Sequence, residues 1–374
     1  MKFIDLNKQY KRIKSQVDAD ILKNLEVGDY ILGENVKKLE ERLAEYVGVN
    51  ECITCASGTD ALQIPLMAHG IGSGDAVFTT NFSYFATTEV ISLVGANPVF
   101  VDIDEKTFNI DVSKLENQII QVLNDGKFNP KAIIPVDLFG QLADYSQIKN
   151  IAKKYNMIII EDAAQSFGAS FNKQKSCSFG DISATSFFPA KPLGCYGDGG
   201  AIFTNDKKIA DICRSIRVHG KGKDKYDNIR IGLNSRLDTI QASVLLNKLN
   251  IFDDELIKRN DIANSYNKKL NNYLVTPSIS EGHISSWAQY CLLAKSSDQR
   301  DNLMAHLNNN GIPTAIYYKK IFSELDFYKE FIHTDFPISK NISTRIFSIP
   351  MHPYLEQDDI DRICNTIIEF LDNE

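Results

Sequence analysis

A lysine surrounded by aromatic, proline and glycine residues is the strongest chemical signal in the sequence. Lys191 lies in the segment Thr-Ser-Phe-Phe-Pro-Ala-Lys-Pro-Leu-Gly-Cys-Tyr-Gly-Asp-Gly-Gly-Ala, residues 185–201. An amine held in a tight apolar turn loses hydration, so its pKa falls and its neutral form can attack a carbonyl to form a Schiff base. On this segment alone, a surface lysine in a glycine-rich loop is the alternative interpretation.

A carboxylate at the end of an apolar run is the second candidate. Residues 158–160 are three isoleucines, and Glu161 and Asp162 follow them directly. Both faces of a strand in a parallel sheet are buried, so an acid at its end needs a partner or a chemical task. Asp162 could alternatively cap a helix, and Glu161 is expected to face away and to be structural. The lysine at 191, after one further predicted strand, favours the chemical interpretation of Asp162.

Two more segments follow predicted strands and could bind a ligand. In the first, the turn Ser57-Gly58-Thr59 opens a helix, where free backbone N–H groups and the positive helix end form an anion site. An ordinary helix N-cap is the alternative. In the second, Tyr84 follows the strand at 77–80 and could stack on a flat heteroaromatic ring or be a core aromatic.

The lysine segment resembles that of the DegT/DnrJ/EryC1/StrS family of nucleotide-sugar aminotransferases, which use pyridoxal 5′-phosphate (PLP). The resemblance extends over essentially the whole chain. Family members that aminate C4 of the sugar typically carry a Thr-Thr-Gly-Glu-Gly-Gly-like phrase after the lysine. This chain has Pro-Leu-Gly-Cys-Tyr-Gly-Asp-Gly-Gly there, which is similar to the enzymes that aminate C3. The resemblance implies a fold type I PLP-dependent transferase.

The resemblance also implies roles for residues at matching positions. Lys191 would hold PLP as a Schiff base and then act as general base and acid. Asp162 would keep the pyridine nitrogen of PLP protonated, which makes the ring an electron sink, and Tyr84 would stack on that ring. Gln165 would bind the phenolic oxygen of PLP. The phosphate would be held by Gly58, Thr59, Ser186 and, from the partner subunit, Asn234.

The implied activity is transfer of an amino group from L-glutamate to C3 of a 3-keto nucleotide sugar by a ping-pong cycle. UDP-2-acetamido-2-deoxy-3-oxo-glucuronate is the expected acceptor, and its product would enter a bacterial surface polysaccharide such as O-antigen. A dTDP-3-keto-6-deoxyhexose and UDP-3-keto-N-acetylglucosamine are the alternatives. The resemblance implies a homodimer with shared active sites. A non-catalytic regulatory protein is the alternative from another class, and the presence of both Lys191 and Asp162 counts against it.

Three residues are candidates for contact with the substrate. Arg236 could pair with a carboxylate of the amino donor or of the sugar, because a guanidinium matches carboxylate geometry, or it could form an intrachain salt bridge. Tyr318 and His352 lie in segments that return to the site in the family, and either could be structural. Relatives often carry a His-Tyr-Pro-like phrase where residues 317–320 read Tyr-Tyr-Lys-Lys, so sugar specificity does not transfer directly.

Composition sets the broad class of the protein. The chain has 374 residues, enough for two packed domains, and its net charge of −7 argues against nucleic-acid binding. The N-terminus has no signal-peptide pattern, and no apolar run approaches the ~18 residues of a membrane span, so we expect a cytoplasmic protein with reduced thiols. Cys52 and Cys55 have the spacing of a zinc knuckle but no second pair, so we expect buried strand thiols and no metal.

Alternating strands and helices must position these residues. Apolar strands separated by helical segments predict an α/β fold with a mostly parallel central sheet flanked by helices and with ligands at the carboxyl edge. The composition changes near residue 249, where a charged helical stretch begins. We therefore predict a large PLP-binding domain over residues 1–248 and a smaller C-terminal α+β domain over residues 249–374.

Overall fold

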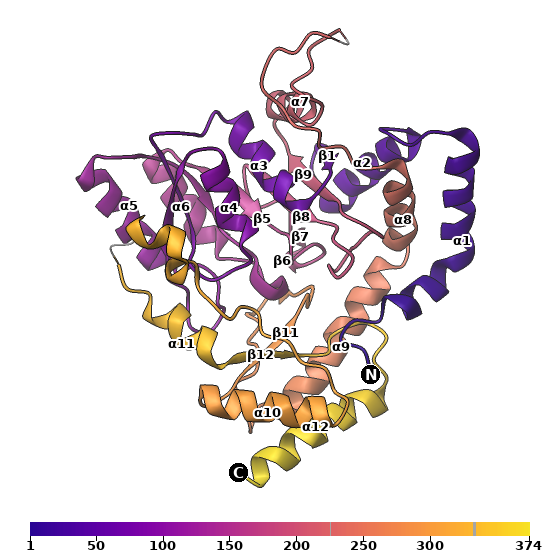
Figure 1. The fold of residues 1–374 in the computed structure, drawn as a ribbon, viewed down its shortest axis with the longest axis vertical. Coiled ribbons are helices and arrows are strands. Elements are labelled where there is room, and N and C mark those ends of the chain that lie inside the picture. Colours follow the sequence, from indigo (N-terminus) through magenta and orange to yellow (C-terminus); the bar gives the residue numbers. More distant parts are fainter. Residues whose placement is uncertain (225, 332–333) are drawn as a thin grey trace.

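A mostly parallel seven-stranded sheet forms the centre of the molecule (Figure 1). The computed structural model describes residues 1–224, 226–331 and 334–374. The strand order is β1-β9-β8-β5-β4-β2-β3, and only β9 runs antiparallel to its neighbours. This confirms the predicted α/β sheet. The strands span Glu51–Cys55 (β1), Asp75–Thr80 (β2), Asn97–Val101 (β3), Asn129–Ile134 (β4), Ile158–Asp162 (β5), Ile182–Ser186 (β8) and Gly200–Thr204 (β9).

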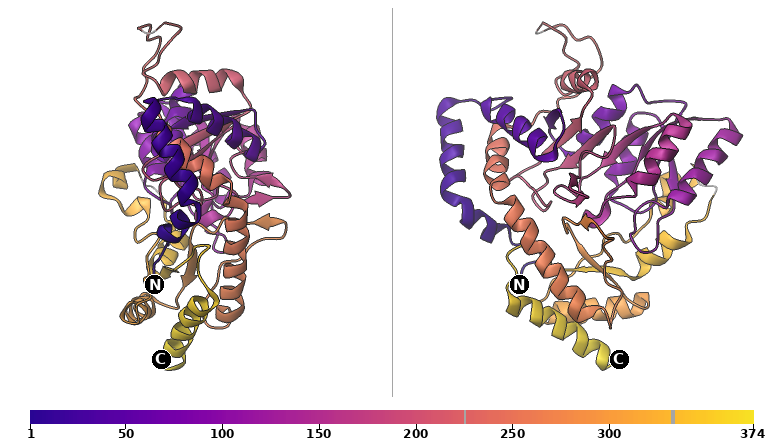
Figure 2. Two further views of the ribbon diagram at one scale, coloured as in Figure 1. Left: turned by 90° about the vertical axis from the view of Figure 1, so that its right-hand side faces the viewer. Right: turned by 180° about the vertical axis from the view of Figure 1, so that it is seen from behind.

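Helices cover both faces of this sheet (Figure 2). One face packs against α3, α4 and α7, and the other packs against α2, α8, α5 and α6. Neighbouring strand residues such as Ile159 and Ile160 belong to opposite cores, which is why β5 is apolar throughout. The helices span Glu34–Val47 (α2), Gly58–Ala68 (α3), Ala86–Leu93 (α4), Val112–Asp125 (α5), Tyr145–Tyr155 (α6), Lys207–Ile216 (α7) and Thr239–Leu249 (α8).

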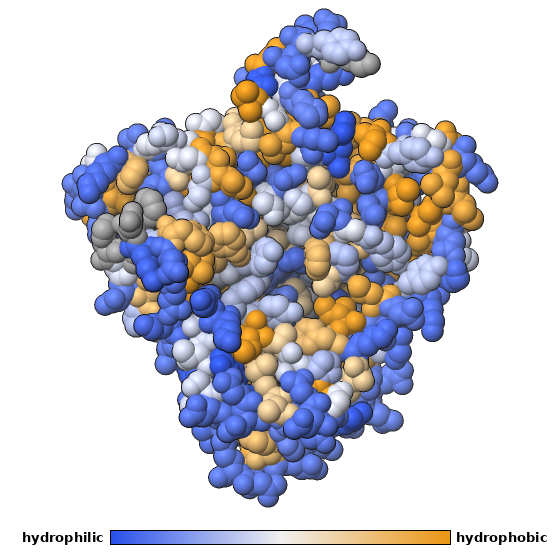
Figure 3. All heavy atoms as spheres, viewed as in Figure 1, coloured by the Kyte–Doolittle hydropathy of each residue, from blue (hydrophilic) through white to orange (hydrophobic). Residues whose placement is uncertain are grey.

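The N-terminal helix α1 (Leu6–Val27) lies at the side of the molecule and packs on α8. Its N-cap Asp5 accepts a hydrogen bond from the Lys8 N–H, and Gly28 ends it in the left-handed conformation that glycine tolerates. Figure 3 shows apolar residues gathered over the region of α1 and α8 that faces the viewer. Several apolar side chains of α1 and of the segment after it are exposed. They are Leu22, Leu25 and Val27, followed along the chain by Tyr30 and Ile31.

The C-terminal part has its own core below the sheet (Figure 1). The helix α9 (Phe252–Leu270) begins in the core under the sheet and ends in this second core. Because α9 joins the two cores without a break, the domain boundary at 248/249 stays a prediction. The other elements of this part are β11 (Tyr290–Leu293), α10 (Ser297–Asn309), the short helices Phe322–Glu324 and Asp326–Phe331, α11 (Pro337–Arg345), β12 (Ile346–Ile349) and α12 (Gln357–Asp372).

Small elements complete the part of the chain that the structure describes. A three-stranded ribbon joins residues after β5 to the C-terminal part, and a one-turn helix follows β4. No helix in residues 1–224, 226–331 and 334–374 is both long and apolar enough to cross a membrane. These small elements are β6 (Ser170–Phe171), β7 (Gln174–Lys175), β10 (His283–Ile284) and the turn Leu138–Gly140.

Glu161 ties a loop to the sheet from inside the protein. Its carboxylate is fully buried and accepts hydrogen bonds from the backbone N–H groups of Cys177 (2.6 Å), Phe179 (2.8 Å) and Gly180 (3.1 Å). It also accepts one from the Ser183 hydroxyl at 2.7 Å. Burial raises the pKa of Glu161 above its usual value. The carboxylate therefore replaces water as the acceptor for a buried loop.

We expect Glu161→Ala to lower stability without removing the cofactor site. The change leaves three backbone N–H groups without their acceptor, at about 1–3 kcal/mol each. Denaturant unfolding should show a loss of about 3 kcal/mol or more in the free energy of unfolding. Glu161→Gln keeps one acceptor oxygen and should lose less. An alanine variant as stable as the wild type would contradict this role.

Candidate active site

The carboxyl ends of neighbouring strands bring the predicted site residues together. Asp162 ends β5, Ser186 ends β8, and the turn at Ser57 follows β1. These three strands run in the same direction within one sheet, so their ends meet at the same edge. Lys191 lies in the loop between β8 and β9, beside that edge.

Asp162 is buried and held by two hydrogen bonds. Its Oδ2 accepts from the Thr87 hydroxyl at 2.7 Å, and its Oδ1 accepts from the Ala164 N–H at 3.2 Å. Burial raises the pKa of Asp162, while these hydrogen bonds and the nearby Lys191 ammonium oppose that rise. The sequence prediction missed Thr87. Its position in the first turn of α4, three residues after Tyr84, was the only local signal for it.

The Lys191 amine is partly desolvated and close enough to Asp162 to sense its charge. The backbone N–H of Lys191 donates to the Phe188 carbonyl at 2.9 Å, which closes a tight turn. The backbone N–H of Cys195 donates to the Phe187 carbonyl at 2.8 Å. Desolvation lowers the pKa of Lys191 to about 8, and the Asp162 carboxylate opposes this shift. The amine is therefore much closer to its nucleophilic neutral form than an exposed lysine.

The start of α3 lies against Ser186 and forms an anion cradle. The N–H groups of Gly58 and Thr59 precede the first helical hydrogen bond, which the Ala61 N–H makes to the Ser57 carbonyl. A side chain on Gly58 would place its Cβ only 2.6 Å from the Ser186 Cβ. Glycine is required here because the helix start and β8 touch. The two N–H groups and the Ser186 hydroxyl could hold a phosphate.

Gln165, Tyr318 and Tyr84 form the other side of the site. The Gln165 Oε1 accepts from the Phe139 N–H at 2.8 Å, and its Nε2 donates to the Tyr318 hydroxyl at 2.9 Å. The rings of Tyr84 and Tyr318 lie 6.3 Å apart and are tilted by 45°. Tyr84 is 59% exposed, so its ring is free to cover a bound ligand. The structure thus brings Tyr318 from the C-terminal part to the Gln165 side chain.

The loop before α8 places Asn234 and Arg236 near the anion cradle. The Ser235 hydroxyl between them donates to Asp60 Oδ2 at 2.6 Å, in the first turn of α3. Asn234 is exposed and Arg236 is partly buried. Arg236 forms no ion pair with any residue in the described part of the chain. The alternative of an intrachain salt bridge for Arg236 thus finds no partner among these residues.

His352 makes its contacts with residues other than these. It is buried, and its Nδ1 accepts from the Tyr354 N–H at 3.3 Å. Burial and then the charge of Arg259 lower the pKa of His352 to about 4, and Asp5 at the N-terminus partly opposes them. Among the described residues, no hydrogen bond, ion pair or ring contact joins His352 to Lys191. Its predicted contact with substrate stays a prediction.

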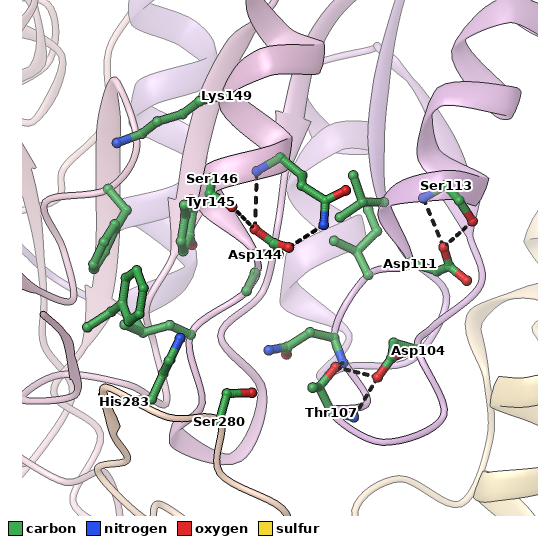
Figure 4. Close-up of a pocket in the computed structure, with 18 of the residues that line it drawn as sticks. Asp104, Thr107, Asp111, Ser113, Asp144, Tyr145, Ser146, Lys149, Ser280 and His283 are labelled. Carbon is green, nitrogen blue, oxygen red and sulfur yellow. Dashed lines mark hydrogen bonds between the residues drawn. The ribbon is translucent and has the colours of Figure 1, made fainter.

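A separate hollow of about 740 Å³ lies between α5, α6 and the segment around His283 (Figure 4). None of the predicted site residues lines it. Two of the acidic residues that line it, Asp111 and Asp144, accept hydrogen bonds from backbone N–H groups in the first turns of α5 and α6. Within the described ranges, no cluster of three or more His, Cys, Asp or Glu side chains could hold a metal ion. Volume alone therefore does not locate the chemistry.

The residues at the sheet edge fit PLP. The cradle at α3 offers N–H groups to a phosphate, Asp162 offers a buried carboxylate to a ring nitrogen, and Lys191 offers an amine of lowered pKa to an aldehyde. Together with the sheet, this site defines a fold type I PLP-dependent transferase. Similar solved structures hold PLP or pyridoxamine phosphate.

Comparisons with known proteins narrow this class. A model of the DegT/DnrJ/EryC1/StrS aminotransferase family matches residues 11–368, and the chain belongs to this family. It is 47% identical to the UDP-2-acetamido-2-deoxy-3-oxo-D-glucuronate aminotransferase of Pseudomonas aeruginosa, over 97% of this chain and 98% of that protein. The protein is thus a PLP-dependent sugar aminotransferase, which confirms the enzyme class and the cofactor predicted from the sequence.

Two further similarities bear on this result. A crystal structure of a DegT/DnrJ/EryC1/StrS aminotransferase from Brucella abortus has a TM-score of 0.97 and 50% identity, and the match covers 99% of both chains. A protein of Geobacillus stearothermophilus named as a pleiotropic regulatory protein is 39% identical over 98% of this chain and 97% of its own length. The family therefore includes a protein named for regulation.

The lowered pKa of Lys191 predicts how PLP binding depends on pH. Only the neutral amine attacks the PLP aldehyde, so recombination of apoenzyme with PLP should speed up with pH and level off above about 8. Asp162→Asn removes the charge that raises the pKa of Lys191, so the midpoint should move to lower pH. Stopped-flow absorbance at saturating PLP measures both. A midpoint near 10.5, the ordinary lysine value, or no change in the Asn variant would contradict the geometry.

Proposed function

We propose that this enzyme transfers an amino group from L-glutamate to C3 of UDP-2-acetamido-2-deoxy-3-oxo-glucuronate. The similarity to the Pseudomonas aeruginosa aminotransferase, which is named for this sugar, carries the proposal. Arg236 supports it, because its guanidinium has no ion-pair partner in the described ranges and matches a uronate carboxylate. The alternative acceptors are a dTDP-3-keto-6-deoxyhexose and UDP-3-keto-N-acetylglucosamine.

The site residues take the roles that the resemblance implies. Lys191 would hold PLP through its amine, and Asp162 would keep the ring nitrogen protonated. Other residues take the remaining groups of the cofactor. Gly58, Thr59 and Ser186 bind the phosphate, Gln165 binds the phenolic oxygen, and Tyr84 stacks on the ring. Tyr318, His352 and Arg236 are the proposed substrate contacts.

The chain's own groups handle the proton and the charges of the reaction. PLP, when bound, supplies an electron sink and a carrier for the amino group. Lys191 would act as the general base for the proton on Cα of glutamate, and a pKa of about 8 suits that role near neutral pH. Asp162 keeps its charge opposite the ring nitrogen because Thr87 and Ala164 donate hydrogen bonds to it. Over the whole cycle the amino group would replace the keto oxygen at C3 of the sugar, and glutamate would become 2-oxoglutarate.

We also propose a homodimer with shared active sites. Asn234 is exposed although it lies beside the anion cradle, and it could serve the phosphate of a second copy. The exposed apolar side chains of α1, Leu22, Leu25 and Val27, provide a face for that copy. We propose further that the enzyme is cytoplasmic and supplies diamino-uronate residues for a bacterial surface polysaccharide such as O-antigen.

A regulatory protein is the competing function, and the name of the Geobacillus stearothermophilus relative favours it. The buried Asp162 carboxylate and the desolvated Lys191 amine argue against it, because each is unfavourable without a cofactor to bind. An enzyme loaded with PLP absorbs visible light, and a regulator without cofactor is colourless. The spectrum of the purified protein separates the two functions.

The two half-reactions can be observed separately. L-Glutamate should remove the visible band of lysine-bound PLP, and Lys191→Ala should abolish this response. Adding the keto uronate to the aminated enzyme should restore the band. Acceptors without the C6 carboxylate should react at least about tenfold more slowly, since a charge-assisted hydrogen bond is worth about 1.5–3 kcal/mol. No visible band, or a response to glutamate in the alanine variant, would overturn the function.

Arg236→Lys should identify the carboxylate that Arg236 binds. Lysine cannot make the paired hydrogen bonds of arginine, so KM for the bound partner should rise about tenfold with little change in kcat. A rise for glutamate assigns Arg236 to the donor, and a rise for the uronate assigns it to the sugar. Arg214→Lys is the matched control, because Arg214 pairs with Glu51 at 2.6 Å. Unchanged KM values for both substrates would remove Arg236 from the site.

A further inference from the structure

A buried lysine lies directly beneath the loop that carries Lys191. Lys248, on α8, is 1% exposed, and its Nζ donates a hydrogen bond to the Gly194 carbonyl at 2.5 Å. The same ammonium lies 4.4 Å from the centre of the Tyr196 ring. Both contacts are to residues of the segment between Lys191 and β9. Lys248 thus touches the catalytic loop and not the predicted substrate face.

Gly194 packs closely against the turn that holds Lys191. A Cβ on Gly194 would lie 2.6 Å from the carbonyl oxygens of both Phe188 and Pro189. The Phe188 carbonyl accepts the hydrogen bond of the Lys191 N–H at 2.9 Å. Gly194 is therefore packed against the backbone of the Lys191 turn with no spare room. A shift of Gly194 must move that turn.

A second residue of α8 holds the same loop. The Gln241 Oε1 accepts a hydrogen bond from the Tyr196 N–H at 2.8 Å, and a Cβ on Gly197 would lie 3.0 Å from the Gln241 Nε2. Gln241 and Lys248 are seven residues apart, two turns of one helix face. The loop is thus fixed to α8 at two points, one on each side of Cys195.

The stability of the fold alone does not explain a lysine at this position. Within the described ranges, no carboxylate lies within ion-pair distance of Lys248. The largest effect of another charge on the pKa of Lys248 comes from Glu255, which accepts hydrogen bonds from Gln9 and Tyr354. Burial lowers the pKa of Lys248 to about 8, which shows that the site disfavours the charge. An apolar residue of this size would be easier to bury.

We propose that Lys248 is a positioning residue for the transamination reaction. Its hydrogen bond to Gly194 holds the segment 188–197 so that the Lys191 amine faces the edge where Asp162 lies. Lys248 acts through the loop and does not touch the reactants. The proposal rests on the proposed role of Lys191 as the PLP-binding and proton-transferring residue.

Lys248→Met tests this role, because methionine fills a similar volume without a donor. The rate of the glutamate half-reaction should fall on the order of 10²-fold, the loss typical of a small misplacement of a reacting group, with KM for glutamate little changed. Hydrogen exchange of the PLP-loaded enzyme should be faster at the amides of residues 191–197 than in the wild type. Lys248→Arg keeps a donor and should recover at least part of both properties.

Asn247→Ala is the matched control. Asn247 is buried on the same helix but donates to Asp20 on α1 at 2.6 Å, away from the Lys191 loop. It should lower stability while the half-reaction rate and the exchange of residues 191–197 stay as in the wild type. Equal losses in the Asn247 and Lys248 variants would reduce Lys248 to a general structural residue and overturn the proposal.

The outcomes separate this proposal from the proposed function. If the wild type responds to glutamate and Lys248→Met matches it in rate and exchange, the positioning role is wrong and the function stands. If the wild type gives no response to glutamate, the function fails. In that case, unchanged exchange in Lys248→Met also overturns the contact, and faster exchange confined to residues 191–197 supports it. Should the methionine variant fail to fold, Lys248→Gln takes its place in the same measurements.

Discussion

The mutual charge effect of Lys191 and Asp162 is the constraint on which the rest of the site depends. Desolvation favours the neutral form of each group, and the charge of each favours the charged form of the other. An amine near its nucleophilic form and a carboxylate that stays charged beside a cationic ring both need a low pKa. Desolvation lowers the pKa of Lys191, and the hydrogen bonds from Thr87 and Ala164 oppose the rise that burial causes in the pKa of Asp162. One sheet edge supplies both groups because β5 and β8 are neighbours, Asp162 ends β5, and Lys191 lies in the loop that follows β8.

Each member of this pair is held by a different helix. Thr87 of α4 donates to Asp162, and α8 holds the loop of Lys191 through Gln241 and Lys248. These two helices pack on opposite faces of the sheet, so the site is fixed from both sides. Rigid elements with hydrogen bonds behind the reacting groups are what preorganised catalysis requires. Glu161, one residue before Asp162, adds to this by tying a loop to the other face of β5.

The proposed cofactor contacts differ in how far the chain buries them. Asp162, Gln165 and Ser186 are buried and hydrogen-bonded within the chain, whereas Tyr84 and Asn234 are exposed. The proposed cofactor site is thus closed at Asp162, Gln165 and Ser186 and open at Tyr84 and Asn234. The apolar side chains of Leu22, Leu25 and Val27 on α1 also stay exposed in the single chain.

The sequence by itself predicted the proposed reacting groups and the sheet that carries them, because those signals are local. An apolar strand ending in an acid, a Ser-Gly-Thr turn before a helix, and a lysine among prolines and glycines each lie within a few residues. Only the tertiary structure decided which residues form hydrogen bonds with these groups and their loops. These pairs are Thr87 with Asp162, Tyr318 with Gln165, and Lys248 with Gly194. These contacts join residues far apart in the chain, and no spacing encodes them, because they depend on how α4, α8 and the C-terminal part pack against the sheet.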